Sequence, residues 1–265
     1  MGKVFCSSDW HGCGILANKV LDYLKEDDVL YFLGDAIDRG DDGFEILIRL
    51  LNDPRVKFIK GNHENMMKKA LPHIIQQLYE YNDIFTYEDE FLEWKLNGGS
   101  TILNQLFNWS IIDLKDLYKK LIDLPLTLTY KNKKEQIIIM EHSGYTPPLL
   151  RNNHDPLWDR SHFNESWSNE QHLQNVYIIH GHTPVQYMKF KYGYKNMSKM
   201  TEKDFEYKHL FFGQEDDELN KIYRPEVLFY CDNHKINVDM CTVASNRIAL
   251  LDLDTFEPIY FDKEN

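Results

Sequence analysis

The chain has 265 residues, 43% of them hydrophobic, which is enough to bury the core of one α/β domain spanning residues 1–265. Its formal net charge of -12 argues against general nucleic-acid binding and against an anionic membrane surface, because such partners are met by a basic face. No apolar run approaches the roughly 20 residues of a membrane span, and the first residues lack the regions of a signal peptide, so we expect a cytoplasmic protein.

Three strand-loop-helix units open the chain. Residues 4–6 predict a strand, and residues 15–26 carry apolar side chains at helical spacing. Residues 29–33 predict a second strand, followed by a helix that ends near Pro54. Residues 56–59 predict a third strand. Strands that alternate with helices indicate a largely parallel sheet, which delivers polar residues at the carboxyl ends of its strands.

The middle of the chain is mostly helical. Residues 66–123 predict a helical layer or cap, interrupted at Pro72 and at residues 97–99. Residues 126–130 and 136–140 then predict two strands on either side of a turn.

The last third begins with a predicted buried strand at residues 176–179. Residues 192–226 are charged and show poor periodicity, so we expect a surface excursion that could act as a lid. Residues 235–239, 247–253 and 258–261 predict a closing antiparallel meander.

Six polar side chains follow five of these strands and predict a metal centre. Two carboxylates, one amide oxygen and three imidazoles exceed the four ligands of a tetrahedral zinc site, and suit two ions that share a bridging carboxylate. Mixed oxygen and nitrogen ligands without thiolate favour Mn, Fe, Ni or Zn. Each histidine alone is more often a structural residue, but their expected convergence on one rim of the sheet favours ligands. The six are Asp9, His11, Asp35, Asn62, His142 and His182.

The residues beside these candidates suit phosphoester hydrolysis. Two divalent ions would activate water and neutralise phosphoryl oxygens. The guanidiniums of Arg39 and Arg160 could hold the phosphate. His63 could protonate the leaving oxygen if the Asp38 carboxylate fixed its tautomer and favoured its protonated form.

The same residues also have structural interpretations. Asp38 and Arg39 could form a local ion pair or cap the following helix. Trp158 could belong to the core with Arg160 lying over it. Glu64 could be a carboxylate in the first turn of a helix, and for Glu64 this is the interpretation we favour.

Five segments together resemble the calcineurin-like metallophosphoesterases, specifically the bacterial and phage type of the phosphoprotein phosphatase branch. The resemblance implies an α/β fold of four αββα layers, in which two mixed β-sheets are flanked by helices. It also implies phosphomonoester hydrolysis by direct attack of a metal-bridging hydroxide. The segments are Asp9-Trp10-His11-Gly12, Gly34-Asp35-Ala36-Ile37-Asp38-Arg39-Gly40, Gly61-Asn62-His63-Glu64, His142-Ser143-Gly144 and His180-Gly181-His182-Thr183.

The resemblance also implies a role for each site residue. Asp9 and His11 would bind one metal ion, Asn62, His142 and His182 the other, and Asp35 would bridge the two ions. His63 and Asp38 would form the acid dyad, while Arg39, Arg160 and Asn62 would contact the substrate phosphate. Of the divalent metals allowed by the ligands, Mn²⁺ is the expected ion, with Fe, Zn or Ni as alternatives.

The substrate class follows from the branch of the family. We expect a serine/threonine protein phosphatase acting on a phosphorylated protein or peptide. Symmetric dinucleoside tetraphosphate hydrolases share the same motifs, so a small phosphoester is the alternative substrate. A catalytically silent phosphate-binding module is disfavoured, because all six ligands are retained together with His63 and Arg39.

Overall fold

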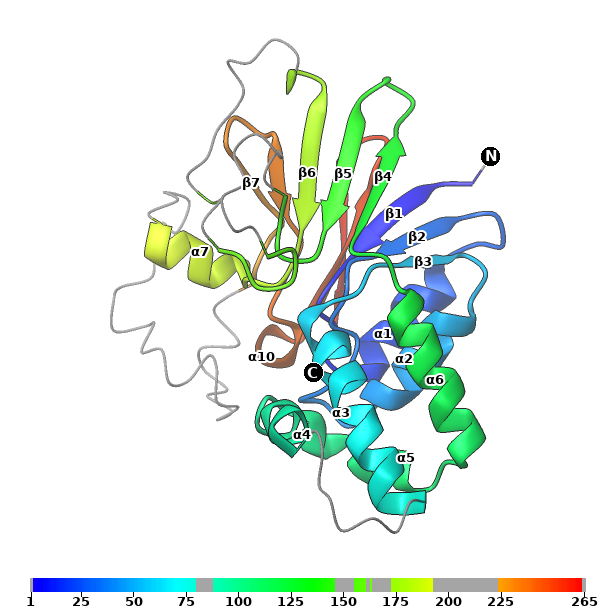
Figure 1. Cartoon of the computed structure of the whole chain (residues 1–265). Coiled ribbons are helices and arrows are strands. Elements are labelled where there is room, and N and C mark those ends of the chain that lie inside the picture. Colours follow the sequence, from blue (N-terminus) through cyan, green and yellow to red (C-terminus); the bar gives the residue numbers. More distant parts are fainter. Residues whose placement is uncertain are drawn as a thin grey trace.

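A computed structural model describes residues 2–79, 88–145, 155–160, 163, 173–192 and 224–263 of the chain. Two mixed five-stranded sheets form its centre and helices flank them, which confirms the predicted fold class (Figure 1). The first sheet has the order β10 (Pro258–Asp262), β9 (Arg247–Asp252), β1 (Val4–Ser7), β2 (Val29–Phe32) and β3 (Val56–Phe58). The second has the order β4 (Thr127–Lys131), β5 (Ile137–Glu141), β6 (Val176–His180), β8 (Lys235–Asn237) and β7 (Leu228–Tyr230).

Parallel pairing brings the strand ends that carry polar residues to the same edge of each sheet. In the first sheet β1, β2 and β3 are parallel, as the strand-loop-helix units predicted. In the second sheet β5, β6 and β8 are parallel. The remaining strands add antiparallel edges, with β9 and β10 beside β1, β4 beside β5, and β7 beside β8.

The central strand β2 of the first sheet is covered on both faces and is a continuous apolar run. Along β2, Leu30 and Phe32 pack in a core with the helices α1 (Gly14–Tyr23) and α2 (Gly43–Asn52). Tyr31 and the following Leu33 face the other way and pack in a second core with residues of the second sheet. This alternation follows from the two-residue period of a strand.

The predicted helical layer consists of α3 (Asn62–Tyr79), α4 (Glu88–Leu96), the 3₁₀ turn η1 (Gly99–Thr101), α5 (Leu103–Phe107) and α6 (Ile111–Asp123). The break at residues 97–99 is confirmed, but the predicted break at Pro72 is wrong, because α3 continues through it. Leu71 and Ile74 beside Pro72 are fully buried, and their packing offsets the backbone hydrogen bond that proline cannot donate.

The closing meander was also predicted wrongly. The strand β8 does not continue into β9 but pairs with β6 and β7 in the second sheet, whereas β9 and β10 complete the first. Strand β7 and the helices α7 (Val185–Tyr192) and α10 (Thr242–Ser245) were not predicted. Residues 193–223, which make up most of the expected excursion, lie outside the described residues. None of the described helices combines the length and apolarity that a membrane crossing needs.

Candidate metal centre

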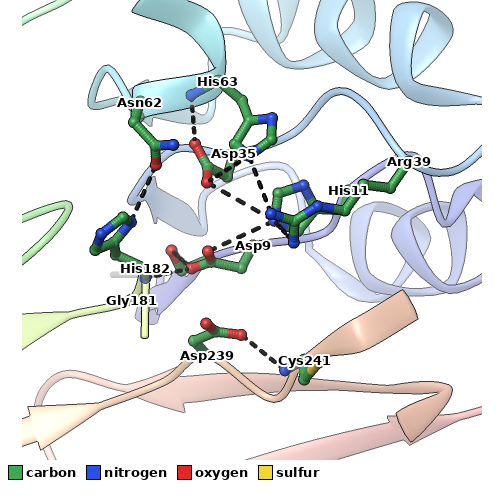
Figure 2. A network of polar contacts seen from close by, with 12 residues as sticks. Asp9, His11, Asp35, Arg39, Asn62, His63, Gly181, His182, Asp239 and Cys241 are labelled. Carbon is green, nitrogen blue, oxygen red and sulfur yellow. Dashed lines mark hydrogen bonds and ion pairs between the residues drawn. The ribbon is translucent and has the colours of Figure 1, made fainter. Parts of the chain in front are cut away.

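The six candidate ligands lie together where the two sheets meet, and Figure 2 labels all of them except His142. Each is buried, with an exposed fraction between 0 and 7%. They come from five strand ends: Asp9 and His11 follow β1, Asp35 follows β2, Asn62 begins α3 after β3, His142 follows β5, and His182 follows β6.

The backbone around these side chains has an unusual conformation. Of the 13 non-glycine residues with positive φ in the described part of the chain, six are site residues: Asp9, His11, Asp35, Asp38, Arg39 and His182. Their φ values, between 42° and 69°, lie in the left-handed region, which costs about 1–3 kcal/mol for a residue with a side chain. Such strain persists only where surrounding contacts hold it, and it concentrates at functional sites.

The loops after β1 and β2 are joined by backbone hydrogen bonds. The N–H of Asp9 donates to the Gly34 carbonyl at 3.0 Å, and the N–H of His11 donates to the Asp35 carbonyl at 3.0 Å. The loop after β3 is equally close, since a Cβ built on Gly34 would lie 2.5 Å from the Cα of Gly61. Only glycine fits this position, and the close approach brings three strand ends together.

Glu64 fixes the loop that carries Asp35. It lies in the first turn of α3, as we expected, but it is fully buried and points at backbone N–H groups. One carboxylate oxygen accepts from Asp35 N at 2.8 Å and Gly61 N at 3.0 Å, and the other accepts from Ala36 N at 2.8 Å. Burial raises the pKa of Glu64 to about 7, with the Asp35 carboxylate adding to this effect and the N–H groups opposing it.

The carboxylate of Asp35 is the centre of the cluster. Its Oδ2 atom lies 3.4 Å from His142 Nε2, 3.7 Å from His11 Nε2 and 3.9 Å from His63 Nε2. Its Oδ1 atom accepts from the backbone N–H of His63 at 3.0 Å. One carboxylate therefore faces imidazoles from both sheets.

The contacts of Arg39 define two of the imidazole tautomers. Its guanidinium lies 2.9 Å from His11 Nε2 and 3.1 Å from His63 Nε2. Because arginine only donates, both Nε2 atoms must accept, and each ring then carries its proton on Nδ1. His11 Nδ1–H donates to the Ile37 carbonyl at 3.0 Å, and His63 Nδ1–H donates to Asp38 Oδ2 at 2.7 Å.

A second group of donor atoms surrounds Asn62. Its Oδ1 lies 2.8 Å from His142 Nε2. It also lies 3.0 Å from His182 Nδ1, a contact that Figure 2 shows. The other nitrogen of His142 donates to the Leu33 carbonyl at 2.7 Å. The Nε2 atom of His182 is buried and has no hydrogen-bond partner among the described residues. A buried imidazole nitrogen left without a partner fits a site that is completed by a further group.

Charges within the cluster determine its protonation states. Burial disfavours the carboxylate of Asp35, but the neighbouring imidazoles, that of His142 foremost, outweigh burial and hold its pKa well below the usual range. Burial raises the pKa of Asp9 to about 6. Burial also disfavours the imidazolium of His142, yet the carboxylates of Asp35 and Asp9 raise its pKa to about 10.

The other two imidazoles are held neutral. Burial lowers the pKa of His11, and the Arg39 guanidinium lowers it further. Burial and the charge of His142 lower the pKa of His182. Neutral imidazole is the form that binds a metal ion.

Two sets of donor atoms are spaced closely enough to hold a metal ion. In each set the ligand atoms lie within 4.8 Å of one another, and all the residues are buried. The sets are His11 with Asp35 and His63, and Asp35 with His142 and His182. Both contain Asp35, so the residues fit two divalent ions that share one carboxylate.

Asp9 was expected as a ligand and stands beside the first set rather than within it. Its Oδ1 atom lies 3.8 Å from His11 Nε2. Its Oδ2 atom accepts from the Ser8 hydroxyl at 2.5 Å and from the backbone N–H of His182 at 3.0 Å. The structure therefore places Asp9 at the site, with one oxygen bonded to the protein.

The predicted dyad is present as a contact between two buried side chains, His63 and Asp38. Asp38 is bonded to His63 and Trp94, and Arg39 contacts two imidazoles, so the alternative of a local pair between Asp38 and Arg39 is not what the structure shows. Trp94 was not predicted, because nothing in its surrounding sequence indicates that its indole reaches a loop 56 residues earlier.

Arg160 and Trp158 lie at the edge of the cluster. Trp158 is 38% exposed and packs edge-on to the His182 ring, with 5.7 Å between ring centroids, so it is not the core residue of the alternative interpretation. The Nε of Arg160 donates to the Thr183 hydroxyl at 2.9 Å, and Arg160 is exposed. Its charge contributes to the lowered pKa of His182.

Asp239 is a further carboxylate that the sequence did not assign to the site. It follows β8 and lies beside Asp9 in Figure 2, and it is 2% exposed. It accepts from the backbone N–H of Cys241 at 2.7 Å. Its position two residues beyond a strand end was the available signal, since Asp9 and His182 also lie two residues beyond the ends of β1 and β6.

The chain belongs to the calcineurin-like phosphoesterase family, whose model matches residues 2–214. The family membership that the motifs implied is therefore confirmed, and it supports a phosphoesterase hydrolase that uses divalent metal. A search of curated proteins found no significant match to the chain.

Two solved structures have a similar fold. One is described as a candidate diadenosine tetraphosphatase, with 14% identity, a TM-score of 0.55, and coverage of 100% of this chain and 95% of that one. The other is a protein serine/threonine phosphatase from Saccharomyces cerevisiae with similarity to human phosphatase PP5. It has 14% identity, a TM-score of 0.51, and coverage of 100% of this chain and 81% of that one. At these identities the comparisons show the fold.

Proposed function

We propose that the chain is a phosphomonoesterase with a two-metal centre, and that its substrates are phosphoserine and phosphothreonine in proteins or peptides. The observation that carries the proposal is the Asp35 carboxylate, which belongs to both sets of closely spaced donor atoms and lies beside the dyad. When bound, two divalent ions supply Lewis-acid activation of water and neutralise phosphoryl oxygens. Asp9, His11, Asp35, Asn62, His142 and His182 would hold them, with Mn²⁺ as the expected metal.

The groups of the chain itself bind and protonate the substrate. Without substrate, the Arg39 guanidinium contacts the Nε2 atoms of His11 and His63. A phosphate that draws this guanidinium away would free His63 Nε2 to carry a proton. Because Asp38 holds Nδ1, the proton that His63 could give to the leaving oxygen would be the one on Nε2. Phosphate binding and acid catalysis are thereby coupled through Arg39.

Reloading metal-stripped protein with Mn²⁺, Fe²⁺, Zn²⁺ or Ni²⁺ singly tests this function. We expect hydrolysis of phosphoserine and phosphothreonine peptides, with less activity toward a symmetric dinucleoside tetraphosphate and a cyclic phosphodiester. A preference for the dinucleotide would support the alternative substrate class. Metal-loaded protein that binds phosphate but hydrolyses none of these esters would instead be a silent binding module.

The variant His63→Asn tests the acid. We expect kcat to fall by about 10²–10⁴, the usual contribution of general acid catalysis, while the metal content stays the same. Loss of metal would contradict this role and make His63 a ligand, as its position within the first donor set allows. The control is His234→Asn, because His234 is partly exposed. Its ring stacks on Tyr177 near the start of β6, whereas the site residue His182 follows the end of that strand.

A further inference from the structure

Trp94 reaches the dyad from a helix with no other part in the site. It is the buried residue of α4, with an exposed fraction of 0%. Its indole Nε1 lies 3.1 Å from Asp38 Oδ1 and 3.0 Å from Asp38 Oδ2. Asp38 is itself fully buried and holds His63 Nδ1 at 2.7 Å, so three side chains form one continuous chain of hydrogen bonds.

The turn after α4 makes a second contact with the loop that carries Asp38 and Arg39. The backbone N–H of Arg39 donates to the Gly98 carbonyl at 3.3 Å, and Gly98 has a φ of 111°, which favours glycine. Gly99 packs against the indole of Trp94, where an added Cβ would lie 2.3 Å from the ring. The segment thus contacts Asp38 through a side chain and Arg39 through the backbone.

The indole limits the freedom of Asp38. A carboxylate held only by His63 could turn about its last side-chain bond, and the imidazole would turn with it. An indole N–H that reaches both oxygens fixes the plane of the carboxylate, and a hydrogen bond to a charged group is stronger than one between neutral groups. Errors of about 1 Å in the placement of a catalytic group can cost about 10²-fold in rate.

We propose that Trp94 is a positioning residue for the acid of the proposed phosphoester hydrolysis, and that α4 completes a Trp94–Asp38–His63 chain that aims His63 at the leaving oxygen. The inference rests on the proposed function. It means that the helical cap takes part in the protonation of the leaving group.

The leaving group distinguishes this role from a structural one. An alkoxide such as the serine oxygen needs a proton in order to leave, whereas 4-nitrophenolate is a stable anion and needs little help. For Trp94→Phe we expect kcat on a phosphoserine peptide to fall by about 10–100-fold. On 4-nitrophenyl phosphate we expect a fall of about threefold or less, with KM for both substrates and the metal content unchanged.

Two further variants make the test decisive. Gly99→Ala pushes against the indole and should give the same dependence on the leaving group if Trp94→Phe does not fold. In an Asp38→Asn background, Trp94→Phe should have no further effect on kcat, because both changes act through one contact. The control is Trp109→Phe, since Trp109 is a partly buried tryptophan that packs edge-on to Phe44 of α2, with ring centroids 4.7 Å apart.

The outcomes separate the two proposals. If the wild-type protein is active, three results for Trp94→Phe would overturn the role of Trp94 alone. These are an equal fall in activity on both substrates, a loss of bound metal, and no change in activity. Wild-type protein that hydrolyses neither substrate with any of the metals would overturn the proposed function, and this inference with it.

Discussion

Replacing Glu64 by glutamine tests whether one buried carboxylate holds the metal-binding loop. Its two oxygens accept three backbone N–H groups, from Asp35, Ala36 and Gly61, at 2.8–3.0 Å. Glutamine has the same shape but only one acceptor oxygen. If this oxygen serves Asp35 and Gly61, the amide NH₂ faces the N–H of Ala36, so that two donors oppose each other.

The magnitude follows from these contacts. A hydrogen bond to a charged group contributes about 1.5–3 kcal/mol, and an unsatisfied buried N–H costs about 1–3 kcal/mol. We expect the free energy of unfolding to fall by about 2–4 kcal/mol, which is a large part of the roughly 5–15 kcal/mol that stabilises a typical domain. The affinity for Mn²⁺ should fall as well, because the loop that relaxes carries Asp35.

Urea unfolding at pH 8, above the pKa of about 7 at which Glu64 ionises, measures both effects with and without Mn²⁺. The matched control is Glu45→Gln, because Glu45 is an exposed carboxylate in the first turn of α2 and should change stability by no more than about 0.5 kcal/mol. A change for Glu64→Gln as small as for the control, with unchanged Mn²⁺ affinity, would refute the reasoning.

Three other predictions concern the phosphate clamp, the protonation of the site and the helix α3. Arg39→Ala should weaken vanadate inhibition by about tenfold or more, because the guanidinium that would meet the oxyanion is removed, whereas Arg49→Ala, whose guanidinium is bonded to Asn18 and Asp22, should not. An unchanged inhibition constant for Arg39→Ala would count against the clamp. The pKa of His142, raised to about 10, means that metal-free protein carries this proton at pH 7 and loses it only as the pH rises through 10. Binding of Mn²⁺ should therefore release a proton, and a calorimetric enthalpy that does not depend on the buffer would contradict this. Pro72→Ala should raise the free energy of unfolding by about 1–3 kcal/mol by restoring a backbone donor inside α3, and a destabilised variant in thermal unfolding would show that the proline ring packs productively.

The residues that converge at the site could be predicted because their positions follow a simple geometric rule. Asp9, Asp35 and His142 each follow a short apolar run by no more than three residues, and parallel strands bring such positions to one edge. The rule needs only the strands and their direction. The family membership, carried by the motifs at these strand ends, was recoverable from the sequence for the same reason.

The parts that could not be predicted depend on contacts between distant segments. The sequence places α4 within a predicted helical layer but does not tell which loop Trp94 will meet. The three-residue strand β8 carries no signal that assigns it to β6 rather than to β9. Pro72 has a strong local preference that packing overrides. Glu64 does lie in the first turn of a helix, as we expected. Of its three backbone partners, Asp35 and Ala36 belong to the loop after β2, and Gly61 directly precedes α3.

The site joins the two sheets. His142 and His182 come from the second sheet, while the groups they face, Leu33 and Asp9, come from the first. An ion bound between these residues would fasten the two halves of the fold together, much as a cross-link does. We therefore expect amide hydrogen exchange to slow on metal addition in strands of both sheets, for example in β2, which precedes Asp35, and in β6, which precedes His182. After chelation of the metal, the two sheets would unfold in separate transitions. With metal bound, the protein would unfold in a single transition, so the metal that serves catalysis would also make unfolding cooperative.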